Sequence, residues 1–148
     1  IPFINMQIAT MEEIKAKLGD KARIGLLATS GTVQTGIYGD KAKALNLPMF
    51  VPDELHQERV MAAIYGPLGA KAGYTDCRED LVSAAEYLVK TYDCNCLILG
   101  CTELPLILDE CDDFVCAGKE VCVVDPTSAL ARKVVRIATE TNKARGTR

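Results

Sequence analysis

The sequence of residues 96–103 is Cys-Leu-Ile-Leu-Gly-Cys-Thr-Glu, four mainly apolar residues followed by a glycine, a thiol and two polar residues. A continuous apolar run indicates a parallel strand covered on both faces, because a strand with one wet face alternates apolar and polar residues. Similar runs occur at residues 2–5, 23–28, 48–51 and 121–124. Helical patterns separate the runs, which predicts an α/β fold with a mostly parallel sheet flanked by helices. We expect one domain over residues 1–148.

Apolar residues at helical spacing predict the intervening helices. They cover residues 8–18, residues 32–45, a segment from Asp53 or Glu54 to Tyr65, a segment that starts at Thr75 or Asp76, and a segment that starts at Asp125 and Pro126. Gly36 and Gly39 weaken the second helix, because glycine disfavours a helix interior. Asp before Pro is a strong helix start, and residues 143–148 are expected to be a frayed tail.

Composition narrows the class of protein. The chain is 49% hydrophobic and 25% charged, with a formal net charge of -3. This mildly acidic balance does not favour nucleic acid or an anionic membrane as a partner. Neither a transmembrane run of about 18 apolar residues nor a signal peptide is recognisable. The sequence starts without Met inside a predicted strand, so we expect that an N-terminal part precedes it.

Seven cysteines are present, an odd number that argues against a closed disulfide framework. Cys94 and Cys96 are separated by one residue, closer than in structural zinc sites, and no second Cys or His pair accompanies them. We therefore expect free thiols, no metal site and a location in the reducing cytoplasm.

Two loops at predicted strand ends could carry chemistry, since ligands of open parallel sheets bind beyond the carboxyl ends of the strands. The first contains Thr29, Ser30, Gly31 and Thr32. Its hydroxyls and the N–H groups of a helix start suit a carboxylate, and its glycine permits close approach of the backbone. An ordinary Thr N-cap followed by a glycine turn is the alternative.

The second loop contains Cys101. A cysteine just before a helix start has its thiolate favoured by unpaired N–H groups, so its pKa is expected to fall toward physiological pH. Such a thiolate can remove a proton from carbon without a histidine. The alternative is a small buried apolar residue, which is our interpretation of Cys96 and Cys122 inside their strands. His56 is the single histidine and lies in a polar helical run, so a Cys–His nucleophile pair is not expected.

Residues 99–106, Leu-Gly-Cys-Thr-Glu-Leu-Pro-Leu, resemble the second catalytic-cysteine motif of the aspartate/glutamate racemase superfamily. Residues 26–32, followed by Tyr38, resemble its substrate-carboxylate loop, and residues 1–6 and 123–127 match its flanking segments in the expected order. The resemblance covers nearly the whole chain and places it in the C-terminal part of such an enzyme.

The resemblance also implies residue roles. Cys101 would be the catalytic residue. Thr102, Lys71 and the first loop would bind the substrate, and Glu103 would contact Cys101 rather than the substrate. Glutamate racemases usually carry His after the Cys-Thr pair, so Glu103 and Lys71 favour aspartate, with glutamate still possible. A solvated loop lysine is the alternative for Lys71.

Such racemases need no cofactor, because one cysteine removes the α-proton and a second returns one on the opposite face. Their first cysteine lies in a Cys-Asn-Thr motif, which this sequence lacks. We therefore expect a chain that supplies only the second cysteine, is inactive alone, and belongs to a homodimer like its relatives. A related isomerase or decarboxylase acting on a dicarboxylate, and a non-catalytic carboxylate-binding module, remain as alternatives.

Overall fold

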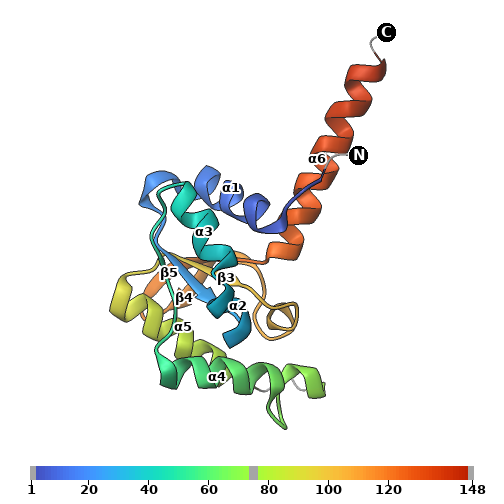
Figure 1. Ribbon diagram of the computed structural model, residues 1–148. Coiled ribbons are helices and arrows are strands. Elements are labelled where there is room, and N and C mark those ends of the chain that lie inside the picture. Colours follow the sequence, from blue (N-terminus) through green and yellow to red (C-terminus); the bar gives the residue numbers. More distant parts are fainter. Residues whose placement is uncertain (1–2, 74–76, 147–148) are drawn as a thin grey trace.

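A five-stranded sheet is the centre of the computed structural model, which describes residues 3–73 and 77–146 (Figure 1). The strand order is β2-β1-β3-β5-β4. Three pairings, β1 with β2, β1 with β3 and β3 with β5, are parallel, and only β4 is antiparallel to its neighbour. The strands are β1 (Ile24–Leu27), β2 (Met49–Phe50), β3 (Cys96–Leu99), β4 (Cys111–Cys116) and β5 (Lys119–Val124). The predicted α/β class with a mostly parallel sheet is confirmed.

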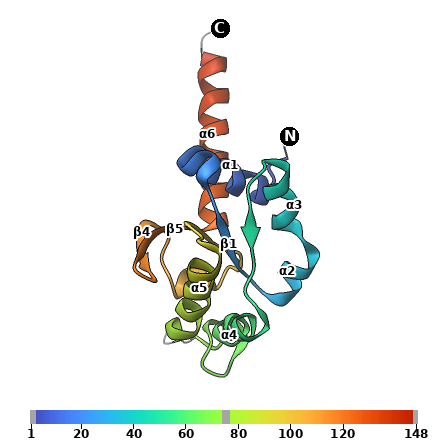
Figure 2. The ribbon, with the colours of Figure 1, turned by 90° about the vertical axis from the view of Figure 1, so that its left-hand side faces the viewer.

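Helices cover both faces of this sheet, as the continuous apolar strands require (Figure 2). The α-helices of the described residues are α1 (Met6–Leu18), α2 (Ser30–Thr35), α3 (Ile37–Ala44), α4 (Glu54–Tyr65), α5 (Arg78–Tyr92) and α6 (Pro126–Gly146). On one face α4 and α5 pack over Leu97 and Leu99, and on the other α1 and α3 pack over Ile98 and Leu26. Alternate residues of one strand thus belong to two separate cores. In the described part of the chain, no helix combines the length and apolarity needed to cross a membrane.

Several predicted boundaries are wrong. Phe3 is 89% exposed, and the strand expected at residues 2–5 is absent from its described part, residues 3–5. Instead Asn5 is the N-cap of α1, where its side chain accepts a hydrogen bond from the Ile8 N–H at 2.9 Å. The predicted helix over residues 32–45 is two helices, because Gly36 takes a left-handed conformation with φ of 67°.

Further differences lie after residue 73. The predicted helix start at Thr75 or Asp76 falls outside the described residues, and α5 is described from Arg78. β4 was not predicted; it forms a hairpin with β5 through Ala117 and Gly118, which both have positive φ. α6 extends to Gly146 and projects from the body, although a frayed tail is expected from residue 143 (Figure 1).

The sheet brings the two candidate loops to one edge. β1 and β3 are adjacent, with Leu27 opposite Leu99, so both loops emerge at the carboxyl end of the sheet. The chain leaves β1 toward β2 on one side and leaves β3 toward β4 and β5 on the other. This reversal is the position where open α/β sheets form ligand crevices.

Candidate active site

Gly100 holds the two loops in contact. Its N–H donates to the Leu27 carbonyl oxygen at 2.7 Å. A Cβ at this position would lie 2.9 Å from the Ala28 Cβ and 2.9 Å from the Leu26 Cδ1. Only a residue without a side chain allows this approach, which places Cys101 directly beside the loop that follows β1.

The first loop is tied together by its own hydroxyls. Thr29 is the N-cap of α2 and accepts a hydrogen bond from the Thr32 N–H at 3.3 Å, and the two hydroxyls lie 3.1 Å apart. The Ser30 N–H faces the sulfur of Met61 at 3.3 Å. Gly31 is exposed. Thr29 is therefore the N-cap of α2, its hydroxyl lies beside that of Thr32, and the carboxylate-binding role of this loop stays a prediction.

A second residue, which sequence reasoning missed, fixes this loop to α4. The Gln57 side-chain amide donates to the Ala28 carbonyl oxygen at 2.8 Å and to the Ser30 hydroxyl at 3.4 Å. The Gln57 Oε1 is buried and has no hydrogen-bond partner among the described residues. Gln57 is half-buried but lies in a polar run of the sequence, so no sequence signal distinguished it from the exposed residues beside it.

Cys101 is half-buried and lies in a small polar network. Its thiol donates to the Glu103 Oε2 at 2.8 Å, and the Thr102 hydroxyl donates to the same oxygen at 3.1 Å. The other Glu103 oxygen lies 3.6 Å from the Lys71 Nζ. A thiol, a carboxylate and a cation are thus linked in that order, and Glu103 lies between Lys71 and Cys101.

The expected lowering of the Cys101 pKa is wrong in this structure. Burial raises the pKa of the thiol, and the hydrogen bond to Glu103 raises it further, while Lys71 acts in the opposite direction. The helix that was expected after Cys101 is a 3-10 turn of three residues, Leu104–Leu106. A turn this short has almost no dipole to favour a thiolate. Cys101 at neutral pH is therefore a protonated thiol that donates to a carboxylate.

Lys71 reaches this network from the connection between α4 and α5. It lies in a 3-10 turn, Ala70–Ala72, and its ammonium is 4.7 Å from the centre of the Tyr65 ring. Tyr65 and then Glu103 raise the pKa of Lys71, so the side chain is a full cation. Its side chain is 46% exposed, which leaves the ammonium accessible to a ligand.

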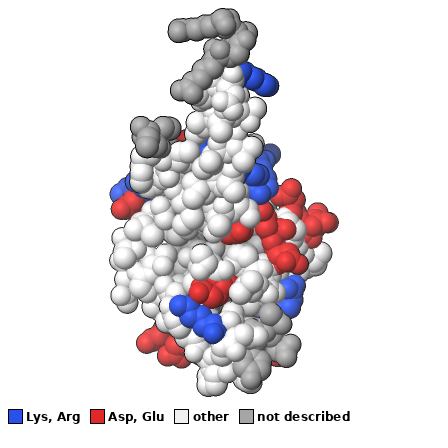
Figure 3. All heavy atoms as spheres, turned by 90° about the vertical axis from the view of Figure 1, so that its right-hand side faces the viewer, with Lys and Arg blue, Asp and Glu red and all other residues white. Residues whose placement is uncertain are grey.

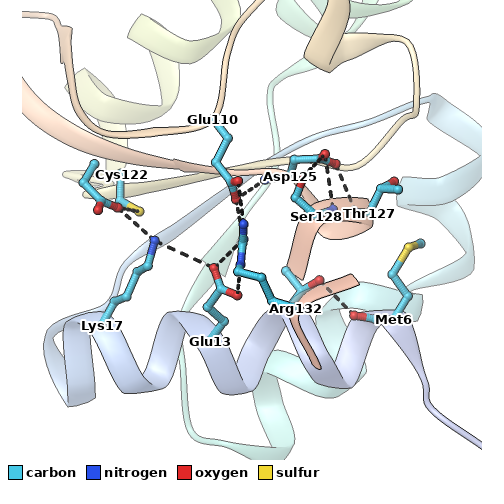
Figure 4. A network of polar contacts seen from close by, with 11 residues as sticks. Met6, Glu13, Lys17, Glu110, Cys122, Asp125, Thr127, Ser128 and Arg132 are labelled. Atoms are coloured by element: carbon cyan, nitrogen blue, oxygen red, sulfur yellow. Dashed lines mark hydrogen bonds and ion pairs between the residues drawn. The ribbon is translucent and has the colours of Figure 1, made fainter. Parts of the chain in front are cut away.

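Tyr38 and Asp125 also lie at the end of the sheet that carries Cys101. Tyr38 of α3 is 2% exposed, and burial, followed by the nearby Asp125 and Cys101, raises its pKa to about 12. Asp125 directly follows β5 and accepts hydrogen bonds from the Thr127 N–H and the Ser128 hydroxyl (Figure 4). Its place after a buried strand, shared with the other two loops, was the available sequence signal.

Several charged side chains away from this site form ion pairs with one another. Arg132 of α6 forms paired hydrogen bonds with Glu13 and with Glu110, which holds α6 against α1 (Figure 4). A hollow of about 240 Å³ between these helices is lined by residues of both signs, including Glu12 and Lys133, which pair with each other. On the face shown in Figure 3, basic side chains are scattered and the larger cluster is acidic. No group of His, Cys, Asp and Glu in the described ranges is arranged to hold a metal ion.

The sequence of residues 1–134 matches the family model of Asp/Glu/hydantoin racemases. The chain belongs to this family. Among its racemase relatives is a glutamate racemase from Desulforudis audaxviator, 33% identical over 118 residues that make up 78% of this chain and 40% of that protein. A protein from Pectobacterium carotovorum, encoded in the pnlA 3' region and uncharacterised, is 37% identical over 94 residues, 64% of this chain and 61% of that protein.

Solved racemase structures share the fold. An aspartate racemase homologue from Pyrococcus horikoshii OT3 has a TM-score of 0.77 and 26% identity, covering 94% of this chain and 57% of that one. The Picrophilus torridus aspartate racemase has a TM-score of 0.67 and 28% identity, with 93% and 53% covered. The chain therefore spans between 40% and 61% of the length of these four relatives.

Proposed function

We propose that this chain supplies one of the two proton-transferring cysteines, Cys101, of a cytoplasmic, cofactor-independent racemase of aspartate. The observation that supports this best is the position of Cys101. It lies at the carboxyl edge of β3, beside the loop after β1 and linked through Glu103 to Lys71, in a chain of the racemase family.

The substrate carboxylates have two complementary partners at this edge. The hydroxyls and N–H groups of the loop that contains Thr29 and Thr32 would hold the α-carboxylate, and Thr102 would close the same side. The Lys71 cation would hold the side-chain carboxylate, for which it would leave its 3.6 Å contact with Glu103. Neutralising both carboxylates lowers the cost of the carbanion that forms at the α-carbon.

Cys101 suits the proton-donating half of the reaction. Because its pKa is raised, the resting side chain carries the proton that the planar carbanion must receive. The second cysteine, supplied from outside this chain, removes the α-proton as thiolate from the opposite face. In the reverse direction the Cys101 thiolate takes the α-proton of the other enantiomer, and Glu103 again accepts the hydrogen bond of the resulting thiol.

Aspartate is proposed over glutamate because Glu103 follows the Cys-Thr pair and Lys71 lies within reach of it. The relatives are named for both substrates, so glutamate is tested in parallel. We also propose a homodimer, which sedimentation of the purified chain tests directly.

The decisive experiment measures α-proton exchange and inversion separately. Purified chain is incubated with L-aspartate in deuterated water, and α-deuterium and D-aspartate are quantified. We expect no sustained inversion. In a separate alkylation experiment, aspartate should slow the modification of Cys101 and alanine should not. Loss of this protection in Lys71→Gln, with Lys15→Gln as a matched charge control on α1, supports the proposed substrate pose.

Three results would overturn the proposal. Sustained inversion by the chain alone, lost in Cys111→Ser as well as in Cys101→Ser, would place the second thiol within this chain; Cys111 pairs with Val123 near the same edge. Carbon dioxide release from a dicarboxylate would identify a decarboxylase. Alkylation of Cys101 that no dicarboxylate slows would favour a binding module for another ligand or a structural thiol.

A further inference from the structure

A second cysteine pair lies on the sheet, away from Cys101. Cys96 of β3 and Cys122 of β5 are register partners on adjacent parallel strands. Both side chains point to the face covered by α1 and α3, since both belong to that core, whereas Cys94 belongs to the core on the opposite face. Neighbouring strands are about 4.8 Å apart, which falls within the Cα separation of about 4.4–6.8 Å that a disulfide spans.

The two thiols differ in access. Cys96 is fully buried, while Cys122 lines a hollow of about 260 Å³ together with Lys17, Leu18 and Asp112. In Figure 4, Cys122 lies on the sheet opposite the Lys17 side chain of α1. Cys122 is 6% exposed and lines the hollow, so a small reagent can meet its sulfur there, whereas Cys96 has no exposed surface.

The surroundings favour Cys122 as the reacting sulfur. Interaction with Cys96 lowers the pKa of the Cys122 thiol, and the Lys17 cation lowers it too, against burial and Asp112, which raise it. The same interaction raises the pKa of Cys96. The Cys122 thiol also donates to the Asp112 Oδ1 at 3.4 Å, and that oxygen accepts from the Lys17 Nζ at 2.9 Å.

We propose that Cys122 and Cys96 form an oxidisable pair, in which Cys122 reacts with hydrogen peroxide and Cys96 then closes a disulfide. The Cys122 thiolate attacks one peroxide oxygen, the O–O bond breaks, and hydroxide leaves as the sulfur becomes a sulfenic acid. The Cys96 sulfur then attacks the Cys122 sulfur as it loses its proton, the S–O bond breaks, and water leaves. Peroxide is the two-electron oxidant of the two thiols. This pair is independent of the proposed racemase role.

Tryptic mapping of the whole chain tests the proposal. Cys122 is the only cysteine of peptide 120–132, and Cys96 lies in peptide 91–119. Brief peroxide treatment, followed by alkylation of the remaining thiols, should link these two peptides by a disulfide. The disulfide-linked pair should be absent in Cys96→Ser and present in Cys94→Ser, a matched variant of a buried cysteine on the other face of the sheet.

Two further variants separate chemistry from misfolding. In Cys96→Ser the oxidation should stop at a sulfenic acid that dimedone captures on peptide 120–132. Lys17→Gln leaves the core untouched and should slow oxidation of Cys122 by about 3–10-fold, the effect of a pKa change of about 0.5–1 unit. Three results would overturn the proposal. They are disulfide-linked peptides that persist in Cys96→Ser, oxidation of Cys122 no faster than that of Cys94, and an unchanged oxidation rate of Cys122 in Lys17→Gln.

Discussion

At the scale of single residues, Cys101 is controlled by two neighbours of opposite charge. Burial raises its pKa first, the Glu103 carboxylate adds to this by accepting the thiol proton in a hydrogen bond, and the Lys71 ammonium opposes both. The position of a thiol after a strand predicts only that it can be reached. Its protonation state depends on which side chains fold back onto it.

Glu103→Gln and Lys71→Gln should therefore change the reactivity of Cys101 in opposite directions. Loss of the Glu103 charge lowers the thiol pKa, so alkylation by iodoacetamide at pH 8 should be about 3–10-fold faster. Loss of the Lys71 charge raises the pKa, so alkylation should be slower by a similar factor. Quantitative peptide mapping across pH 7–10 gives both values, and changes of the same sign in the two variants would contradict this electrostatic account.

Gly100 is the second residue whose identity is fixed by its contacts. Gly100→Ala would force a Cβ to 2.9 Å from the Ala28 Cβ, an atom that no rotamer change can move. We expect a loss of about 1–3 kcal/mol in the free energy of unfolding, measured with urea. Gly31→Ala is the matched control, because its Cβ would lie 4.0 Å from its nearest neighbour. Its stability should stay within about 0.5 kcal/mol of the parent.

At the scale of elements, the sequence predicted the buried strands from their apolar runs and missed the edge strand, whose structure depends on pairing with its neighbour. β1, β3 and residues 121–124 of β5 are buried on both faces, so their apolar runs are unambiguous. β4 carries Asp112 and Asp113 and is buried on one side of a sheet edge, so its pattern resembles a loop. The parallel strands predicted that the two loops would meet. The raised pKa of Cys101 depends on burial and on the hydrogen bond to Glu103, and neither could be predicted from the spacing of residues in the sequence.

The start of α6 is an element-scale case in which the sequence signal was sufficient. The Asp125 carboxylate accepts from the Thr127 N–H at 3.0 Å and the Ser128 N–H at 3.3 Å, and the residue is 9% exposed. Asp125→Ala should lower the free energy of unfolding by about 1 kcal/mol, or up to about 2 because the site is buried. Asp125→Asn keeps one acceptor and should lose less; equal losses in urea unfolding would show that the cap is not the cause.

At the scale of the whole molecule, the core contains thiol and phenol groups that stay protonated in the folded protein. Burial raises the pKa of Cys94 and of Cys116 from 9.0 to about 11, and burial raises that of Tyr38 from 10.0 to about 12. These groups come from three different elements or their flanks, and they lie on both faces of the sheet. Alkaline pH should therefore destabilise both sides of the sheet.

The sign of that response follows from proton linkage. The unfolded chain ionises these thiols near pH 9, whereas the folded chain holds their protons to about pH 11. Their contribution is therefore complete below pH 9 and is lost as the pH rises toward 11, on the order of 1–3 kcal/mol for each thiol. Urea unfolding at pH 7.5, 9 and 10.5 under reducing conditions measures this loss. Cys94→Ala should be less stable at pH 7.5 yet lose less stability between pH 9 and 10.5, because one buried thiol no longer has to stay protonated; parallel curves for the two proteins would rule out Cys94 as a source of the dependence.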